Sequence, residues 1–146
     1  MFRGRYSHQI DAKGRLSVPS KFREVLAAGF DERVIVTNFD ECLWAYPVAE
    51  WQKLEGKVGE LPQFLDEVKA LQRVFISAAV ECPIDGQGRI LIPPTLRDYA
   101  GFTKDVIVVG MTRKFEIWAK ERWEDVFRGA KLKLDSMGSK LAELGL

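Results

Sequence analysis

Two arginines in this chain each end a short turn sequence that is suited to presenting a side chain to a ligand. The two sequences are Asp11-Ala12-Lys13-Gly14-Arg15 and Asp85-Gly86-Gln87-Gly88-Arg89. A guanidinium carries N–H donors in a fixed plane that fits guanine O6 and N7, or two phosphate oxygens. A tight turn containing glycine projects the arginine outward on a stiff hairpin. Arg15 and Arg89 are therefore the first candidates for contact with a nucleic acid.

Further cations surround the first of these turns. Lys13, Arg3, Arg5 and Lys21 suit contacts to phosphate oxygens, which position a protein without reading sequence. His8 fits a half-exposed strand position beside them, where it can touch phosphate.

Charge is distributed unevenly along the chain, although its formal net charge is only +1. Residues 1–24 contain six Lys or Arg and two Asp or Glu, a net +4, whereas residues 85–104 contain three and two, a net +1. Such asymmetry can create a basic face on a nearly neutral protein. We expect the first turn to dominate contact with an anionic partner, and the second to contribute as much to the fold as to binding.

The other motif residues are expected to build the turns. Gly14 and Gly88 can adopt positive φ without steric cost, and Asp11 and Asp85 can accept hydrogen bonds from the backbone two residues on. A carboxylate only accepts hydrogen bonds and repels phosphate, so we expect each aspartate to hold its turn or to orient the neighbouring arginine. An alternative stays open, in which both arginines pair with these aspartates and never meet DNA.

The turn sequences belong to a tandem repeat. An offset of 74 residues also pairs Ile10 with Ile84, Phe22 with Leu96, and Arg23 with Arg97. The elements expected in the first repeat are a strand over 6–10, a strand over 15–18, a short helix with Ser20 as its N-cap and Gly29 beyond its end, and strands over 34–37 and 43–46. The second repeat is expected to have a strand ending at 84, strands over 89–92, 106–109 and 115–118, and a helix over 95–100.

This order predicts four regions in an α+β, β-rich chain. They are a first repeat over 1–54, a linking helix over 55–77, a second repeat over 78–123, and a C-terminal helix and tail over 124–146. A unit of about 50 residues made of hairpins and one short helix is marginal alone. We therefore expect each repeat to complete the sheet of the other, so that one core forms from both.

Composition argues against several other classes of protein. The chain has 146 residues, of which 47% are hydrophobic and 29% charged, as in an ordinary folded domain, and no apolar run is long enough to span a membrane. Two cysteines and one histidine predict neither a disulfide scaffold nor a metal site, and no cofactor is expected. The adjacent Ser7 and His8 suggest hydrolysis, but a strand would point them to opposite faces, and no GxSxG, HExxH or phosphate-loop sequence is present. We expect a cytosolic protein that is not an enzyme and has no small-molecule substrate.

The paired turns also carry a family resemblance. A double Asp-x-x-Gly-Arg turn, each copy followed by a strand, a proline and a short helix, resembles the SpoVT/AbrB superfamily of bacterial DNA-binding domains. With Met1-Phe2-Arg3-Gly4 and the run from Gly14 to Glu24, the chain resembles the MraZ family of transcriptional regulators over residues 1–132. It departs from the symmetric pattern where Gly86, Gln87 and Pro94 replace Ala12, Lys13 and Ser20, which leaves the second copy less basic.

The resemblance implies a fold and a function. The fold is an interlocked, swapped-hairpin, AbrB-like barrel made by both hairpin-helix-hairpin repeats, with peripheral helices, and its subunits self-associate into a ring. The function is binding of double-stranded DNA at promoter direct repeats, mainly as a repressor of the cell-division and cell-wall gene cluster that encodes the protein, in the cytoplasm and associated with the nucleoid. The DNA-binding surface transfers to Asp11, Lys13, Gly14 and Arg15, and to Asp85, Gly88 and Arg89. A ring-forming adaptor that binds another protein through its helices, with no DNA role, is the alternative.

Overall fold

Strands from both repeats make two antiparallel sheets in the computed structural model, which describes residues 1–29 and 31–146. The strands are β1 (Arg5–Gln9), β2 (Arg15–Ser17), β3 (Arg33–Phe39), β4 (Cys42–Pro47), β5 (Val80–Pro83), β6 (Arg89–Leu91), β7 (Asp105–Gly110) and β8 (Phe115–Ala119). All eight coincide with strands expected from the sequence, within a few residues at each end. The fold is mixed α+β and rich in strands, as predicted.

The large sheet exchanges its edge strands between the repeats. Its order is β1-β7-β8-β4-β3-β5, so β1 of the first repeat pairs with β7 of the second, and β5 of the second pairs with β3 of the first. The registers place His8 opposite Val106 and Cys82 opposite Val34. This confirms the prediction that each repeat completes the sheet of the other.

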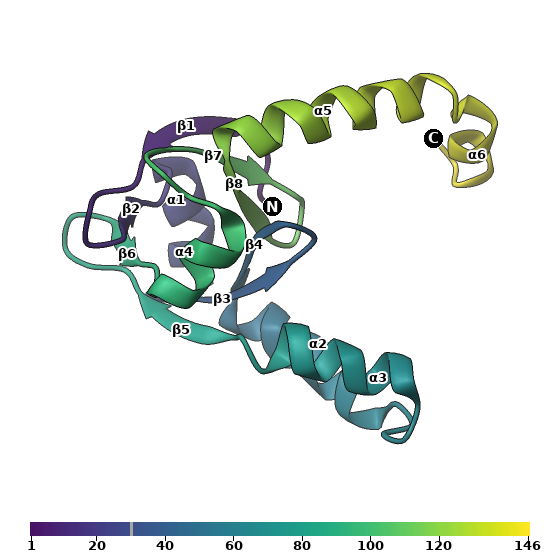
Figure 1. Cartoon of the computed structure of the whole chain (residues 1–146), viewed down its shortest axis with the longest axis horizontal. Helices are drawn as coiled ribbons and strands as arrows, with labels where there is room; N and C mark the ends of the chain where they lie inside the picture. The colour runs from purple at the N-terminus through teal and green to yellow at the C-terminus, as the bar shows by residue number, and fades with distance from the viewer. Residues whose placement is uncertain (30) are drawn as a thin grey trace.

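Closure of the sheet into a barrel is not seen among the described strands. β1 and β5 are its two edges, and β2 and β6 form a separate two-stranded ribbon instead of extending either edge. Each strand of this ribbon has only three residues and pairs across the repeats, with Leu16 opposite Ile90 at its centre. The ribbon lies apart from the open sheet at one end of the molecule (Figure 1).

The core fills the space between one face of the large sheet, the ribbon and two short helices, α1 (Ser20–Ala28) and α4 (Pro94–Ala100). Phe22 of α1 packs against Phe115 of β8 with ring centroids 5.1 Å apart, and Leu16 and Ile90 are buried beside them. Burying a side chain of this size contributes roughly 1.5–3 kcal/mol. Both repeats therefore depend on one shared core.

Four further helical segments and one π-helical turn lie outside this core. They are α2 (Val48–Glu60), α3 (Asp66–Leu71), the π-helical η1 (Gln72–Ile76), α5 (Lys120–Asp135) and α6 (Gly138–Glu143). Trp51 of α2 and Phe75 of η1 pack on the second face of the sheet, against Ile35 and Tyr46. Two helical arms therefore extend from the strands, α2 with α3 on one side and α5 with α6 on the other (Figure 1). Residues 55–77, predicted as one linking helix, hold the end of α2, then α3 and η1.

The predicted N-cap of α1 is wrong. Ser20 is the first residue of the helix and makes no capping hydrogen bond, and the cap residue is Pro19. The backbone N–H groups of Phe22 and Arg23 donate to the Pro19 carbonyl, so the backbone itself begins the helix. In residues 1–29 and 31–146, no helix combines the length and apolarity needed to cross a bilayer.

Candidate nucleic-acid interface

The Asp11 side chain organises the first turn. Its Oδ1 accepts hydrogen bonds from the backbone N–H groups of Arg15 at 2.8 Å and Lys13 at 3.0 Å. Gly14 closes the turn by donating its N–H to the Asp11 carbonyl at 3.0 Å, with a φ of 90° that favours glycine. The Arg15 backbone N–H, and then the Arg15 guanidinium, hold the pKa of Asp11 below its usual range.

The second turn repeats this geometry. Asp85 Oδ1 accepts from the backbone N–H groups of Gln87 at 2.8 Å and Arg89 at 3.0 Å, and Gly88 donates to the Asp85 carbonyl with a φ of 76°. The Arg89 backbone N–H is the main reason that the pKa of Asp85 is also lowered. Both aspartates are therefore ionised at neutral pH and fixed by the turns that they build.

Each aspartate also holds the arginine that follows, but at one atom only. Asp11 Oδ2 accepts a hydrogen bond from Arg15 Nε at 2.8 Å, and Asp85 Oδ2 accepts one from Arg89 Nε at 3.3 Å. A guanidinium has four further donors on its two Nη atoms. In the described part of the chain these Nη atoms of Arg15 and Arg89 have no hydrogen-bond partner. Pairing with aspartate thus orients each arginine and leaves its bidentate edge available.

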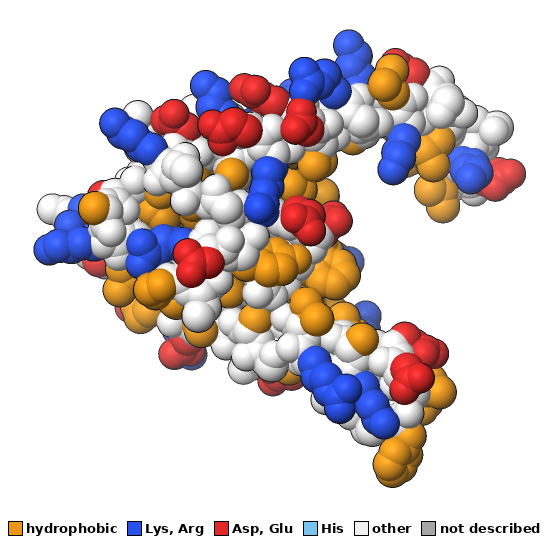
Figure 2. All heavy atoms as spheres, in the orientation of Figure 1, with side chains coloured by type: hydrophobic (Ala, Val, Ile, Leu, Met, Phe, Trp, Pro, Cys, Tyr) orange, Lys and Arg blue, Asp and Glu red, His pale blue; other side chains and the backbone are white. Residues whose placement is uncertain are grey.

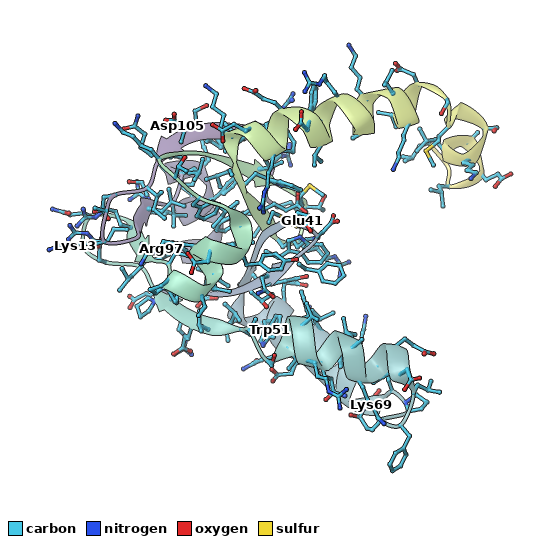
Figure 3. The ribbon with its side chains drawn as sticks, viewed as in Figure 1. Lys13, Glu41, Trp51, Lys69, Arg97 and Asp105 are labelled. Carbon is cyan, nitrogen blue, oxygen red and sulfur yellow. The ribbon has the colours of Figure 1, made fainter. Side chains whose placement is uncertain are left out.

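The β2–β6 ribbon joins the two turns, which lie at its opposite ends. Arg15 lies opposite Leu91 in the register, and Arg89 lies opposite Ser17. At the ends of the ribbon the Ile92 N–H donates to the Gly14 carbonyl at 2.8 Å, and the Val18 N–H donates to the Gly88 carbonyl at 2.9 Å. The central pair Leu16 and Ile90 is buried, so both motif arginines lie on the outward face of the ribbon, at the end of the molecule where Figure 3 shows Lys13 at the outermost tip.

Two more arginines belong to this end, and the sequence reasoning gave them no role. Arg23 of α1 donates its Nε–H to the Val18 carbonyl at 3.1 Å, and Arg97 of α4 donates its Nε–H to the Ile92 carbonyl at 3.0 Å. Their equivalence at the repeat offset was the signal that marked them as a pair. The sequence could not show that each lies against a turn, because the turn in question belongs to the other repeat.

The surroundings of the two turns differ in charge. A hollow of about 500 Å³ beside the first turn is lined by Lys13 and Arg97 and by one acid, Glu81. A hollow of about 330 Å³ beside the second turn is lined by Arg23 and by three acids, Asp31, Glu32 and Asp85. Figure 2 shows Lys and Arg side chains at the ribbon end of the face that it draws, and others along both helical arms. The first turn therefore has the more favourable local charge for an anionic ligand.

Comparison with known proteins shows the family of this chain. Residues 1–74 and 75–140 each match the family model described as "MraZ protein, putative antitoxin-like". The chain belongs to the MraZ family. Each matched segment contains one Asp-x-x-Gly-Arg turn, so the tandem repeat of the sequence is the repeat of the MraZ family.

Several curated relatives are each named "Transcriptional regulator MraZ". The chain is 49% identical over 134 residues to the one from Syntrophobacter fumaroxidans, covering 92% of this chain and 86% of the relative. It is 44% identical to the one from Acetivibrio thermocellus over the full length of both, and 43% identical to the one from Pelotomaculum thermopropionicum over 100% of this chain and 99% of the relative.

The remaining predicted residues of this MraZ-family chain lie at different distances from the turns. Lys21 is exposed on the first turn of α1, two residues before Arg23. Arg5 begins β1, at the end of that strand away from the Asp11 turn, and its guanidinium lies 4.9 Å from the centroid of the Phe127 ring of α5. Arg3 is exposed just before it.

His8 lies on the inward face of β1. It alternates with exposed neighbours and shares the face of Tyr6, which packs on the core. Partial burial lowers the pKa of His8, so at neutral pH it can meet phosphate as a neutral donor rather than as a cation. In the residues that the structure describes, no group of three His, Cys, Asp or Glu side chains could hold a metal ion.

Proposed function

We propose that this chain is a transcriptional regulator that binds double-stranded promoter DNA through its two Asp-x-x-Gly-Arg turns. The observation that carries the proposal is the geometry of Arg15 and Arg89, each held at Nε by an aspartate with both Nη atoms available at one end of the molecule. Such an edge fits guanine O6 and N7 or two phosphate oxygens. The name that the curated relatives share, "Transcriptional regulator MraZ", supports the same function.

The proposed DNA contacts are of two kinds, contacts to base edges and contacts to phosphates. Arg15 and Arg89 read base edges, and Lys13 and Lys21 bind phosphates and fix the register of the protein on the duplex. Arg3 and Arg5 lie along or just before β1, so their contact with phosphate requires the duplex to follow that strand. His8 lies on the opposite face of β1 from Arg5, so its contact requires the duplex to reach the free edge of this strand. The β2–β6 ribbon covers the open end of the core and, on this proposal, makes the two repeats a single interlocked barrel.

The biological setting of the proposal follows the family resemblance. The protein acts in the cytoplasm, associated with the nucleoid, and represses the cell-division and cell-wall gene cluster that encodes it. Its sites are short direct repeats in that promoter. The first turn dominates the contact, because its hollow is lined by Lys13 and Arg97 whereas three acids line the hollow of the second.

Binding to a fragment of the promoter upstream of its own gene tests this function. We expect a gel shift or anisotropy titration to give saturable binding that weakens steeply as salt rises, because each phosphate contact releases counterions. Scrambling the direct repeats at constant length and composition should remove the tight component. Equal affinity for the scrambled fragment would contradict a sequence-specific regulator and favour the alternative, a ring-forming adaptor.

Self-association into a ring is part of the same proposal. The connection between α2 and α3, at the tip of that arm, exposes apolar side chains, with Phe64 91% exposed and Leu61 and Leu65 about half exposed. The α5 arm exposes a second apolar set, Val126, Phe127, Leu132 and Leu134. These sets lie on different arms (Figure 1), so a contact between them in two copies is heterologous and can close a ring. Exposed apolar sets of this kind are typical of protein interfaces.

Replacing Phe64 by glutamate is expected to break this assembly. The charge would have to be buried in an apolar contact, so the variant should sediment as smaller species. Affinity for a promoter with several repeats should fall by about 10²–10⁴, while affinity for a single repeat is kept, since avidity is lost and the turns are not. Gln52→Glu, on the exposed face of α2, is the control for added charge. Unchanged sedimentation of Phe64→Glu would exclude this interface.

A further inference from the structure

We infer that Arg97 and Arg23 are positioning residues, each of which holds the DNA-contacting turn of the other repeat. The inference rests on the proposed function for its consequence in DNA binding. Its structural part stands on the contacts of these two arginines alone.

Two successive hydrogen bonds link Arg97 of the second repeat to the turn of the first repeat. Arg97 Nε donates to the Ile92 carbonyl at 3.0 Å, and the Ile92 N–H donates to the Gly14 carbonyl at 2.8 Å. Both backbone polar groups of Ile92 are thus used, one toward α4 of its own repeat and one toward the first turn. Arg97 thereby fixes the residue on which the turn before Arg15 is anchored.

The equivalent pair of hydrogen bonds in the other repeat holds the second turn. Arg23 Nε donates to the Val18 carbonyl at 3.1 Å, and the Val18 N–H donates to the Gly88 carbonyl at 2.9 Å. An arginine of the first repeat therefore supports the turn before Arg89. The two pairs of hydrogen bonds occupy equivalent positions in the tandem repeat, so neither arrangement is an accident of one loop.

Direct packing reinforces each pair of hydrogen bonds. A Cβ placed on Gly14 would lie 2.8 Å from Arg97 Nε and 3.0 Å from its Cζ, and a Cβ placed on Gly88 would lie 2.7 Å from Arg23 Nη1. Each guanidinium consequently lies against the bare Cα of a turn glycine in the other repeat. This close approach gives each glycine a second requirement besides its positive φ.

The geometry distinguishes a positioning role from a simple phosphate contact. Lysine keeps the positive charge of arginine but has neither the planar guanidinium that lies on the glycine nor the Nε–H that reaches the carbonyl. Arg97→Lys should therefore preserve a phosphate contact and lose the support of the first turn. Arg23→Lys is the matched variant for the second turn.

Amide hydrogen exchange tests the structural part without DNA. In Arg97→Lys we expect exchange at the Gly14 and Arg15 amides to rise by about fivefold to tenfold, the factor that corresponds to loss of one net hydrogen bond, while Gly88 and Arg89 change less. Arg23→Lys should give the reverse pattern. A larger rise in the turn of the same repeat, no rise in either turn, or global unfolding of both variants would overturn the inference.

A double-mutant cycle tests the consequence for DNA binding, measured at low salt with the intact promoter fragment. Arg97→Lys alone should weaken DNA binding by at least about fivefold. In the double variant with Arg15→Ala it should cause little further loss of affinity, whereas in the double variant with Arg89→Ala the two losses should multiply. If the affinity loss of Arg97→Lys multiplied with that of Arg15→Ala as fully as with that of Arg89→Ala, Arg97 would not act through the first turn. If the wild-type protein binds no promoter DNA, the proposed function fails, and the exchange pattern still decides whether the arginines hold the opposite turns.

Discussion

We expect Arg15→Ala to abolish detectable binding to the repeat-containing promoter at physiological salt, and Arg89→Ala to weaken it by a smaller factor. A bidentate contact to a base is worth about 1–3 kcal/mol, or roughly 5-fold to 150-fold, and the loss multiplies when several copies engage several repeats. Arg15 has the larger effect because Lys13 and Arg97 line the hollow beside it, whereas three acids line the hollow beside Arg89.

The measurement is a salt-dependent gel shift with folding and assembly checked for each variant. Arg113→Ala is the control. Arg113 is exposed in the β7–β8 connection, so its substitution removes the same charge at a place away from the turns. Binding of Arg15→Ala that equals the wild type would remove the site assignment. Equal losses from Arg15→Ala and Arg89→Ala would contradict the predicted asymmetry.

The second large effect concerns the stability of the fold. Gly14→Ala places a Cβ on a residue with a φ of 90°, only 2.6 Å from the backbone oxygen of Ile92. The positive φ alone costs about 1–3 kcal/mol for a residue with a side chain. Relieving the clash also disturbs the hydrogen bond from Ile92 to Gly14, which contributes about 1 kcal/mol. We expect the free energy of unfolding to fall by about 2–4 kcal/mol and Tm by about 10 °C.

Alanine variants of two other glycines serve as comparisons for the Tm of Gly14→Ala, measured by thermal unfolding. Gly88→Ala should be less damaging, because the atoms that its Cβ meets belong to the Arg23 side chain, although its φ is also positive. Gly86→Ala should be close to neutral, since its Cβ meets no atom within 4 Å and its φ is not in the left-handed region. A Tm of Gly14→Ala equal to that of Gly86→Ala would show that the Gly14 geometry is wrong.

Local chemistry explains which features could be predicted from the sequence. An Asp-x-x-Gly turn is specified by its own residues, because Asp11 accepts from backbone N–H groups two and four residues later and Gly14 takes the positive φ. Strand β1 follows from alternating residues, and β3 and β7 follow from short continuous runs of β-branched apolar residues. The repeat offset then transferred each assignment to the second half of the chain, including the turn at Asp85.

The features that sequence reasoning missed depend on contacts between distant residues. The interlocked barrel stays a prediction, because β2 and β6 pair with each other and not with the edges of the large sheet, a choice of partner that neither three-residue strand specifies alone. The roles of Arg23 and Arg97 depend on glycines in the opposite repeat. Ser20 was predicted to cap α1 from its residue type, but the Pro19 carbonyl accepts the first N–H bonds.

The central claim is that the two turns touch DNA, and site-specific crosslinking tests it most directly. A single cysteine introduced at the exposed Ala12 would carry a thiol-attached photocrosslinker, with Ala49→Cys on α2 as the control. The native Cys42 and Cys82 are buried, which raises the pKa of both thiols, that of Cys82 to about 11, so they should react little. We predict efficient crosslinking to the promoter repeats from position 12 and none above background from position 49. Crosslinking from position 49 but not from position 12 would contradict the account.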